Sequence, residues 1–237
     1  MINNNKIIAI IPARGGSKGI KNKNIRKVNN KHLIGYTIEE AKKSNYIDEI
    51  IVSTDSKKIA EVSKMYGANV PFLRPKIYAS DTSKTIDAIV FTLEELSKQG
   101  NRYDILVLLQ PTQPLRTVID IDKCLEQFIL YDKKSTVSVS KVEDHPILYR
   151  TINNDKTLNK MLSISSTCRR QDMPDYYKVN GCIYINSVDE VNNNLSFNDN
   201  IMGYIMSEEH SLDIDEYKDL YLFKYFLSKK SRWLYNE

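Results

Sequence analysis

The chain has 237 residues, of which 41% are hydrophobic and 27% are charged, and its formal net charge is +4. This length and composition are typical of one large globular domain, or of one domain that carries an insertion. The mild charge and the lack of an aromatic-rich recognition motif argue against a nucleic-acid-binding protein, and no apolar run is long enough to span a membrane. The first residues lack a signal-peptide hydrophobic region, so we expect a cytoplasmic protein.

Residues 7–11 form a short apolar run that predicts a buried strand. Strand and helix patterns then alternate, with helices expected at residues 33–44, 56–66, 84–98 and 120–131 and strands at residues 49–53, 70–73, 104–109 and 136–140. The run at residues 104–109 is almost continuously apolar, as is typical of a central parallel strand. The alternation predicts an α/β fold, a mainly parallel twisted sheet with helices on both faces.

The alternation breaks at residues 141–178, which are polar and lack long periodic segments. We therefore predict a core formed by residues 1–141 and 179–237, with a small excursion at residues 142–178. After the excursion, we expect strands at residues 181–186 and 204–207. A last helix is expected at residues 216–226, where it would bury Leu220, Phe223 and Leu227 or their neighbours.

The strand at residues 7–11 leads into a loop that is both glycine-rich and cationic. Its glycines and cations are Gly15, Gly16 and Gly19, and Arg14, Lys18, Lys21 and Lys23. Glycine lets a backbone approach a ligand closely, and the cations add fixed positive charge. A strand that feeds such a loop at its carboxyl end is typical of phosphate binding in α/β proteins.

Two common phosphate-binding loops do not match this sequence. A Walker A loop has a lysine directly after its second glycine, whereas Ile20 follows Gly19 here. A dinucleotide fingerprint has the order Gly-x-Gly-x-x-Gly, which residues 15–19 do not provide, and this argues against a hydride-transferring enzyme. The remaining alternative is a basic surface loop without a ligand.

Two acidic residues near the carboxyl end of the chain are candidate metal ligands. Asp213 and Asp215 alternate with Leu212 and Ile214, and residues two apart in an extended segment point to the same side. Two carboxylates on one side suit Mg²⁺, which prefers oxygen ligands and shares them with substrate phosphates. An acidic turn in which Asp215 caps the last helix is the alternative.

The glycine-rich loop resembles the opening motif of the sugar-activating cytidylyltransferases, especially the acylneuraminate cytidylyltransferases (CMP-sialic acid synthetases). The matching residues are Ala13-Arg14, Ser17-Lys18-Gly19 and Lys23-Asn24. Four further blocks follow in the family's order: Ser53-Thr54-Asp55; Arg74-Pro75 with Ser80-Asp81-Thr82; Leu109-Gln110-Pro111-Thr112 with Pro114-Leu115-Arg116; and Asn180-Gly181 with Ser211-Leu212-Asp213-Ile214-Asp215. The resemblance therefore covers almost the whole chain.

The resemblance implies a Rossmann-like fold of the nucleotide-diphospho-sugar transferase type and a Mg²⁺-dependent reaction, with Mn²⁺ as a substitute. The reaction joins CTP to a nine-carbon α-keto acid sugar, N-acetylneuraminate or a close relative, and gives a CMP-sugar for cell-surface polysaccharide together with pyrophosphate. Legionaminic acid, pseudaminic acid and the eight-carbon acid Kdo are alternative acceptors. An inactive nucleotide-binding regulator on the same fold is the alternative from another class, against which Asp213 and Asp215 argue.

The resemblance also implies roles for individual residues. The catalytic set is Arg14, Lys23, Asp213 and Asp215, and the last two are the metal site. The nucleotide site is Ala13, Arg14, Gly15, Ser17, Lys18, Lys23, Asn24, Arg74, Ser83 and Thr85. The sugar site is Gln110, Arg170, Asn180, Tyr184 and Phe197. The excursion at residues 142–178 resembles the region that joins relatives into homodimers and places residues over the partner's sugar pocket.

Alternatives remain open at several of these positions. Ser83 and Thr85 could equally cap the helix at residues 84–98, and Tyr184 could belong to the core. The family's usual serine is replaced by Gln113, which leaves the identity of the acceptor sugar open. The three cysteines, Cys124, Cys168 and Cys182, lack metal-site spacing, and we expect reduced and mostly buried thiols.

Overall fold

A computed structural model describes residues 2, 4–17, 19–164, 167, 169 and 173–233, with side chains described as far as residue 229. Lys18, Cys168 and Arg170 lie outside the described residues. The helices are α1 (Leu33–Lys42), α2 (Lys57–Met65), α3 (Thr85–Lys98), α4 (Val118–Leu130) and α5 (Tyr217–Trp233). The strands are β1 (Ile7–Pro12), β2 (Lys27–Val28), β3 (Lys31–His32), β4 (Glu49–Ser53), β5 (Ile105–Leu109), β6 (Thr136–Lys141), β7 (Arg150–Ile152), β8 (Leu158–Lys160), β9 (Tyr177–Ser187) and β10 (Met202–Ile205).

Six of these strands form one sheet in the order β10-β6-β9-β5-β1-β4. Strand β1 pairs in parallel with β4 and β5, and β10 pairs in parallel with β6. Strand β9 runs antiparallel to both of its neighbours, β5 and β6. The expected mainly parallel sheet is therefore confirmed, with one strand reversed. The reversal arises because the excursion, and no crossover helix, connects β6 to β9.

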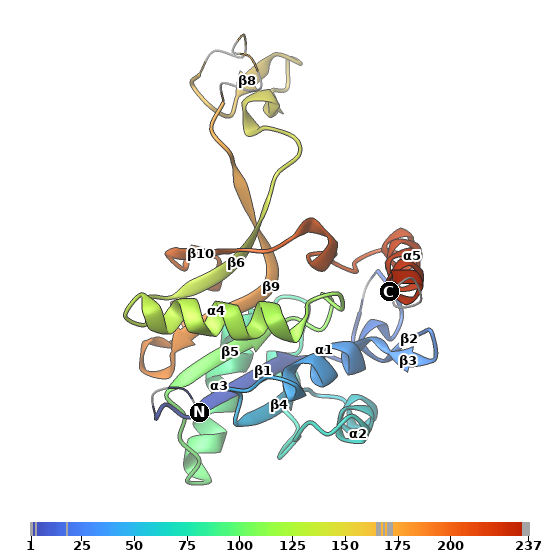
Figure 1. Ribbon diagram of the computed structural model, residues 1–237, viewed down its shortest axis with the longest axis vertical. Coiled ribbons are helices and arrows are strands. Elements are labelled where there is room, and N and C mark those ends of the chain that lie inside the picture. The colour runs from blue at the N-terminus through green and yellow to red at the C-terminus, as the bar shows by residue number, and fades with distance from the viewer. Residues whose placement is uncertain are drawn as a thin grey trace.

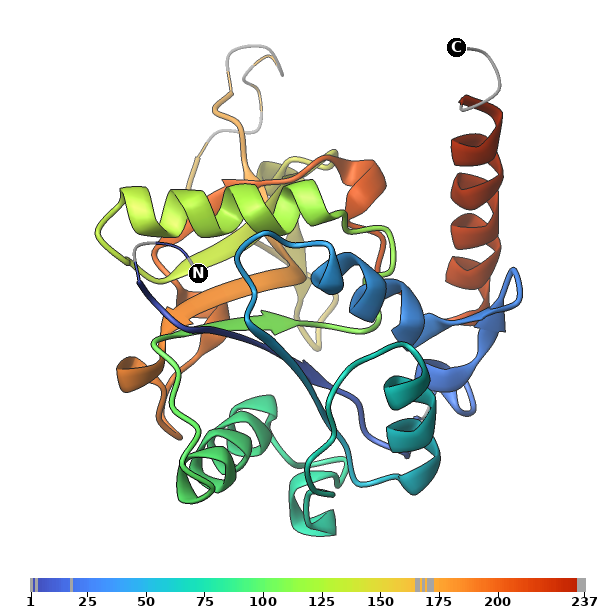
Figure 2. The same cartoon turned by 60° about the horizontal axis from the view of Figure 1, so that its bottom comes forward.

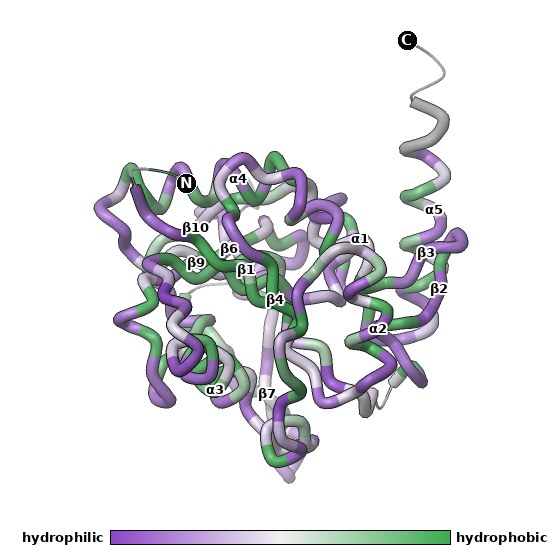
Figure 3. The backbone as a smooth tube through the Cα atoms, turned by 90° about the horizontal axis from the view of Figure 1, so that it is seen from below, coloured by the Kyte–Doolittle hydropathy of each residue, from purple (hydrophilic) through white to green (hydrophobic). Residues whose placement is uncertain are grey.

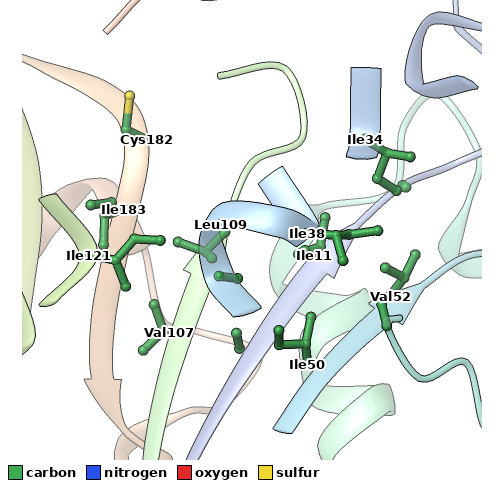
Figure 4. Packing of buried hydrophobic residues seen from close by; sticks show 14 of the residues in the cluster. Ile11, Ile34, Ile38, Ile50, Val52, Val107, Leu109, Ile121, Cys182 and Ile183 are labelled. Carbon is green, nitrogen blue, oxygen red and sulfur yellow. The ribbon is translucent and has the colours of Figure 1, made fainter. Parts of the chain in front are cut away.

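The two faces of the sheet are covered by different helices. Alternate residues of β1 point to opposite faces, so Ile11 packs with α1, α2 and α4, whereas Ile10 packs with α3. Figure 2 shows α4 and α1 above the sheet and α3 below it. Figure 3 shows β1 and β4 as hydrophobic strands at the centre of the molecule, and in Figure 4 Ile38 of α1 lies against Ile11. The expected cover of helices on both faces is confirmed.

The strand expected at residues 70–73 is wrong. Only Asn69 reaches the sheet edge, where it forms an isolated bridge with Ile51 of β4. Pro71 follows and has no backbone N–H with which to continue a ladder. The chain instead runs to Arg74, whose N–H donates to the Thr54 carbonyl at 2.9 Å. This path brings a cation to the carboxyl end of β4.

Strand β9 also begins earlier than expected, because Tyr177 and Lys178 pair with the last residues of β6. The two strands leave the body of the molecule together, and beyond them the chain forms an arm with the β7–β8 hairpin near its tip (Figure 1). The arm exposes apolar side chains, including those of Leu148, Ile152, Leu158 and Met161. None of the described helices is long and apolar enough to cross a membrane. The division into a core and an excursion at residues 142–178 stays a prediction.

Candidate active site

The carboxyl ends of β1, β4 and β5 meet at one edge of the sheet, where open α/β sheets bind ligands. A cavity of about 420 Å³ opens there. Its walls come from the glycine-rich loop, the segment between Arg74 and α3, the loop after β5, and the acidic segment before α5. The predicted site residues that line it are Arg14, Ser17, Lys23, Asn24, Arg74, Ser83, Thr85, Gln110 and Asp215.

Two of the predicted nucleotide-site residues shape the glycine-rich loop and are absent from the lining of this cavity. Ala13 is fully buried, and its N–H donates to the Ser53 carbonyl at 2.9 Å. The Gly15 N–H donates to the Asp55 carboxylate at 2.8 Å. Asp55 was recognised only as part of a motif. Its position at the carboxyl end of β4, next to β1, is the signal that could have assigned it this role.

The glycine-rich loop lies directly against the acidic segment, although almost the whole chain separates them in sequence. A Cβ atom added to Gly19 would lie 2.5 Å from the Asp215 carbonyl oxygen, so only glycine fits there without a shift of the backbone. The Lys23 ammonium donates to the Ile214 carbonyl and to the Asp215 carboxylate, each at 2.8 Å. These contacts hold a cation and a carboxylate at the same wall of the cavity.

Arg14 contacts a different wall, the segment between Arg74 and α3. Its guanidinium lies 2.8 Å from the Asp81 carboxylate and donates to the Ser80 carbonyl at 3.0 Å. Asp81 and Tyr78 line the cavity, and the sequence did not assign either of them to it. Tyr78 stacks on Phe91 of α3 at a centroid distance of 5.0 Å, which fixes its ring.

Arg74 is a buried cation in the wall of the cavity. Arg74 is 6% exposed, and its Nε atom has no hydrogen-bond partner among the described residues. Desolvation lowers the pKa of the guanidinium, while the nearby Asp55 charge opposes that shift. Guanidinium groups remain charged at neutral pH even after such a shift. A buried donor without a partner is costly, so its retention here favours contact with a ligand.

The two helix-cap alternatives are both wrong. Lys84 is the N-cap of α3 and makes no side-chain capping bond, and the Ser83 hydroxyl donates instead to the Ile77 carbonyl at 2.6 Å. Helix α5 begins at Tyr217, and the carboxylate that accepts from the backbone N–H groups before it belongs to Asp219. The hydroxyls and the Asp215 carboxylate are therefore not needed for capping.

A second cavity of about 510 Å³ adjoins the first, and both are lined by Lys84, Thr85 and Gln110. Tyr184 and Phe197 form its apolar wall, with their ring centroids 5.8 Å apart. Tyr184 is nearly buried, and its hydroxyl donates to the Asn198 side chain at 3.0 Å. It thus belongs to the core and to the cavity at once.

Asn180 and Asp213 line a third cavity, of about 680 Å³, between the base of the arm and α5. Ile214 is fully buried, and Asp213 and Asp215 flank it on either side, as the predicted alternation requires. The two carboxylates nevertheless line different cavities. Desolvation of its carboxyl, with a contribution from the Asp215 charge, raises the pKa of Asp213, while a hydrogen bond from Thr112 opposes the shift.

The loop after β5 rests on two buried polar side chains to which the sequence assigned no role. Arg116 is 2% exposed and donates to the Cys182 carbonyl at 2.6 Å and to the Thr37 hydroxyl at 2.9 Å. Burial lowers the pKa of Arg116 to about 10, which still leaves it charged at neutral pH. The buried Gln113 amide donates to the Asn180 carbonyl at 2.8 Å. These bonds fix the loop relative to β9 and α1.

Comparisons with known proteins define the class of this site. The family model described as "Cytidylyltransferase" matches residues 8–229. The chain therefore belongs to the cytidylyltransferase family and is a nucleotidyltransferase, as the resemblance of its motifs predicted.

Two relatives and one solved structure are informative. The chain is 37% identical over 215 residues to the CMP-N,N'-diacetyllegionaminic acid synthase of Legionella pneumophila. This alignment covers 89% of this chain and 91% of that protein. It is 34% identical over 229 residues to the N-acylneuraminate cytidylyltransferase of Escherichia coli, covering 96% of this chain and 53% of that protein. A structure of CMP:2-keto-3-deoxy-manno-octonic acid synthetase complexed with CTP has a TM-score of 0.72 at 17% identity, with 95% and 99% coverage, and confirms the predicted fold.

Proposed function

We propose that the protein transfers the cytidylyl group of CTP to a nonulosonic acid and releases pyrophosphate. The observation that carries this proposal is the first cavity, in which Arg14, Lys23, Arg74 and Asp215 face one space at the carboxyl ends of the strands. The names of the two relatives favour a legionaminic or an N-acylneuraminic acid as the acceptor. Pseudaminic acid and Kdo are the alternatives that an acceptor panel would test.

In this reaction the anomeric hydroxyl of the sugar attacks the α-phosphorus of CTP in line, and its proton passes to a base, for which Asp213 or a water bound to it is the candidate. The bond between the α-phosphorus and the bridging oxygen breaks, and pyrophosphate leaves. The protein has little covalent work to do, so positioning and neutralisation of charge provide the catalysis. The Arg14 guanidinium offers a rigid fork to two phosphate oxygens, whereas the Lys23 ammonium acts as a mobile point charge. Both cations already form ion pairs with carboxylates. On binding the triphosphate, each cation would either keep its carboxylate as a second partner or give it up for a phosphate oxygen.

The donor set fits Mg²⁺, with Mn²⁺ as a substitute. Asp213 and Asp215 provide hard oxygen ligands on either side of a buried isoleucine, and Mg²⁺ sites commonly use one or two carboxylates with substrate phosphates. No group of three or more acidic, histidine or cysteine side chains is close enough to hold a metal within the described part of the chain. The bound ion would neutralise negative charge on the triphosphate.

The acceptor would occupy the space beyond the first cavity. Gln110 stands where the first and second cavities join, and Tyr184 and Phe197 offer apolar contacts there. We place the other end of the acceptor beside Asn180, at the wall of the third cavity. We assign the carboxylate of the sugar to Arg170, which lies outside the described residues, because a guanidinium binds a carboxylate with two parallel hydrogen bonds.

The nucleotide preference is the first testable consequence. We expect CTP to support pyrophosphate release at least about a hundredfold faster than ATP or GTP. We assign the base to Arg74, Ser83 and Thr85, and a purine would leave the buried Arg74 donor without a partner. The measurement is pyrophosphate release with each triphosphate and a panel of nonulosonic acids. Equal turnover with a purine triphosphate would contradict the base-site assignment. Binding of CTP without pyrophosphate release from any acceptor would instead support an inactive nucleotide-binding regulator.

Assembly is the second consequence. We propose that the arm joins two copies of the chain into a homodimer, because it exposes several large apolar side chains at its tip. Ile152→Asp should weaken the dimer at least tenfold, as measured by light scattering across a range of micromolar concentrations. The matched control is Ile201→Asp, since Ile201 is 72% exposed on the body and Ile152 is 73% exposed on the arm. An active wild-type monomer, or equal effects of the two changes, would refute this assignment.

A further inference from the structure

Strand β9 carries a large irregularity opposite Ser138 of β6. Val137 pairs with Tyr184 and Val139 pairs with Val179, so residues 180–183 of β9 face Ser138 alone. Gly181 has a φ of 78°, a backbone conformation that favours glycine. Bulges of this kind re-aim side chains next to functional sites. Here the irregular segment contains Asn180, which lines the third cavity.

The hydrogen bonds around Ser138 determine which way the Asn180 amide points. The Ser138 hydroxyl oxygen accepts from the Ile183 N–H at 2.8 Å, so its own proton is free to donate to Asn180 Oδ1, 2.6 Å away. The Cys182 N–H donates to the same Oδ1 atom at 3.1 Å. A backbone N–H can only donate, so the amide oxygen must face Cys182 and Ser138. The amide nitrogen therefore points away from them.

The backbone of the bulge is held just as firmly. The Gln113 side chain donates to the Asn180 carbonyl, and Arg116 donates to the Cys182 carbonyl. Asn180 is 8% exposed, and its Nδ2 atom has no hydrogen-bond partner among the residues that the structure describes. The Asn180 carbonyl and Oδ1 atoms are both bonded, so the network leaves one buried donor without a described partner in a residue that lines the third cavity. A buried donor left without a partner points to a ligand.

We infer that Ser138 is a positioning residue for the acceptor: it fixes the Asn180 amide so that the NH₂ group, and not the oxygen, is offered to an oxygen atom of the sugar acid. The inference rests on the proposed function. Ser138 is fully buried and lines none of the three cavities, so it can influence the sugar only through its neighbours, of which Asn180 lines a cavity. Without its hydroxyl, the amide loses one of the two donors that distinguish oxygen from nitrogen, and the Ile183 N–H loses its acceptor. The Asn180 amide then populates the flipped orientation, in which its oxygen, and not its NH₂ group, faces the oxygen atom of the sugar. Two hydrogen-bond acceptors then face each other.

The test compares Michaelis constants for the two substrates in single variants of the full chain. Ser138→Ala should raise the KM for the sugar acid about three- to tenfold, with the KM for CTP changed less than twofold. The sugar acid is the one that gives the fastest pyrophosphate release with the wild-type protein. Ser138→Cys, which keeps a weak donor, should give an intermediate value and carries the test if Ser138→Ala does not fold. The matched control is Ser63→Ala, which removes an equally buried hydroxyl bonded to the Ile59 carbonyl in α2.

The outcomes separate the inference from the proposed function. A rise in the KM for the sugar acid alone, absent in Ser63→Ala, supports a positioning role, because a merely structural loss would lower the melting temperature without this selectivity. Unchanged constants, or equal rises for both substrates, in a folded Ser138 variant would overturn the inference and leave the proposed function standing. A wild-type protein that releases no pyrophosphate with any nonulosonic acid would overturn the proposed function, and the inference with it.

Discussion

Asp215→Asn is expected to lower kcat by about a hundred- to a thousandfold, the size of effect that follows loss of one charged group from a nucleotidyl-transfer site. The Asp215 carboxylate lines the first cavity and ion-pairs with Lys23, so the change removes both the proposed metal ligand and the partner of a catalytic cation. The free energy of unfolding should change little, because the Asp215 side chain is 71% exposed and exposed ion pairs contribute little to stability.

The matched control is Glu216→Gln, which removes the neighbouring carboxylate. Glu216 is exposed and ion-pairs with Lys218 at 3.0 Å, so its loss should leave kcat within about twofold of wild type. Both variants would be assayed for pyrophosphate release over a range of Mg²⁺ concentrations, with melting temperatures measured in parallel. Near wild-type activity of Asp215→Asn at limiting Mg²⁺ would show that Asp215 is no metal ligand.

Gly19→Ala should have the second large effect, lowering kcat/KM for CTP by about ten- to a hundredfold. The added Cβ would lie 2.5 Å from the Asp215 carbonyl oxygen, which is backbone and cannot swing aside as a flexible side chain could. Relief of the clash must separate the glycine-rich loop from the acidic segment and so disturb the Lys23–Asp215 pair. Overpacking of this kind also costs about 1–3 kcal/mol of stability.

Gly16→Ala provides the control within the same loop, since nothing lies within 4 Å of a Cβ atom added there. We expect this variant to keep wild-type kinetics and the wild-type melting temperature. Steady-state kinetics with CTP as the varied substrate, together with thermal unfolding, would distinguish the two. If Gly16→Ala is as damaging as Gly19→Ala, the loop needs glycine for its flexibility, and contact with Asp215 is not the reason.

Local patterns predicted most of the body of the fold. The apolar run of β5 and the helical spacing of α1 and α3 depend only on neighbouring residues, and the structure bears them out. The expected strand at residues 70–73 failed because apolar character cannot compensate for the N–H that Pro71 lacks. The antiparallel direction of β9 could not be predicted from the sequence either. It depends on the path of the chain between β6 and β9, and that path has no periodic pattern in the sequence.

The same distinction applies to the site. Motif matching identified nine side chains that the first cavity brings together, although their roles remain predictions. It missed Asp81 as the partner of Arg14, and it could not foresee that Asp213 and Asp215 line separate cavities. The Ser138–Asn180 bond joins residues 42 positions apart through a bulge. No spacing rule within the sequence encodes such a contact, because it depends on the register of two strands.

Strand β9 begins at Tyr177 and contains both Asn180, which lines the third cavity, and Tyr184, which lines the second. In Figure 1 this strand runs from the arm into the sheet. One strand thus connects the surface proposed for dimerisation with the walls proposed for the acceptor site. If a partner copy held the arm in place, the strand would transmit that restraint to the walls, and a bound acceptor would restrain the arm in return. By thermodynamic linkage, we expect acceptor affinity and arm binding to reinforce each other by the same factor.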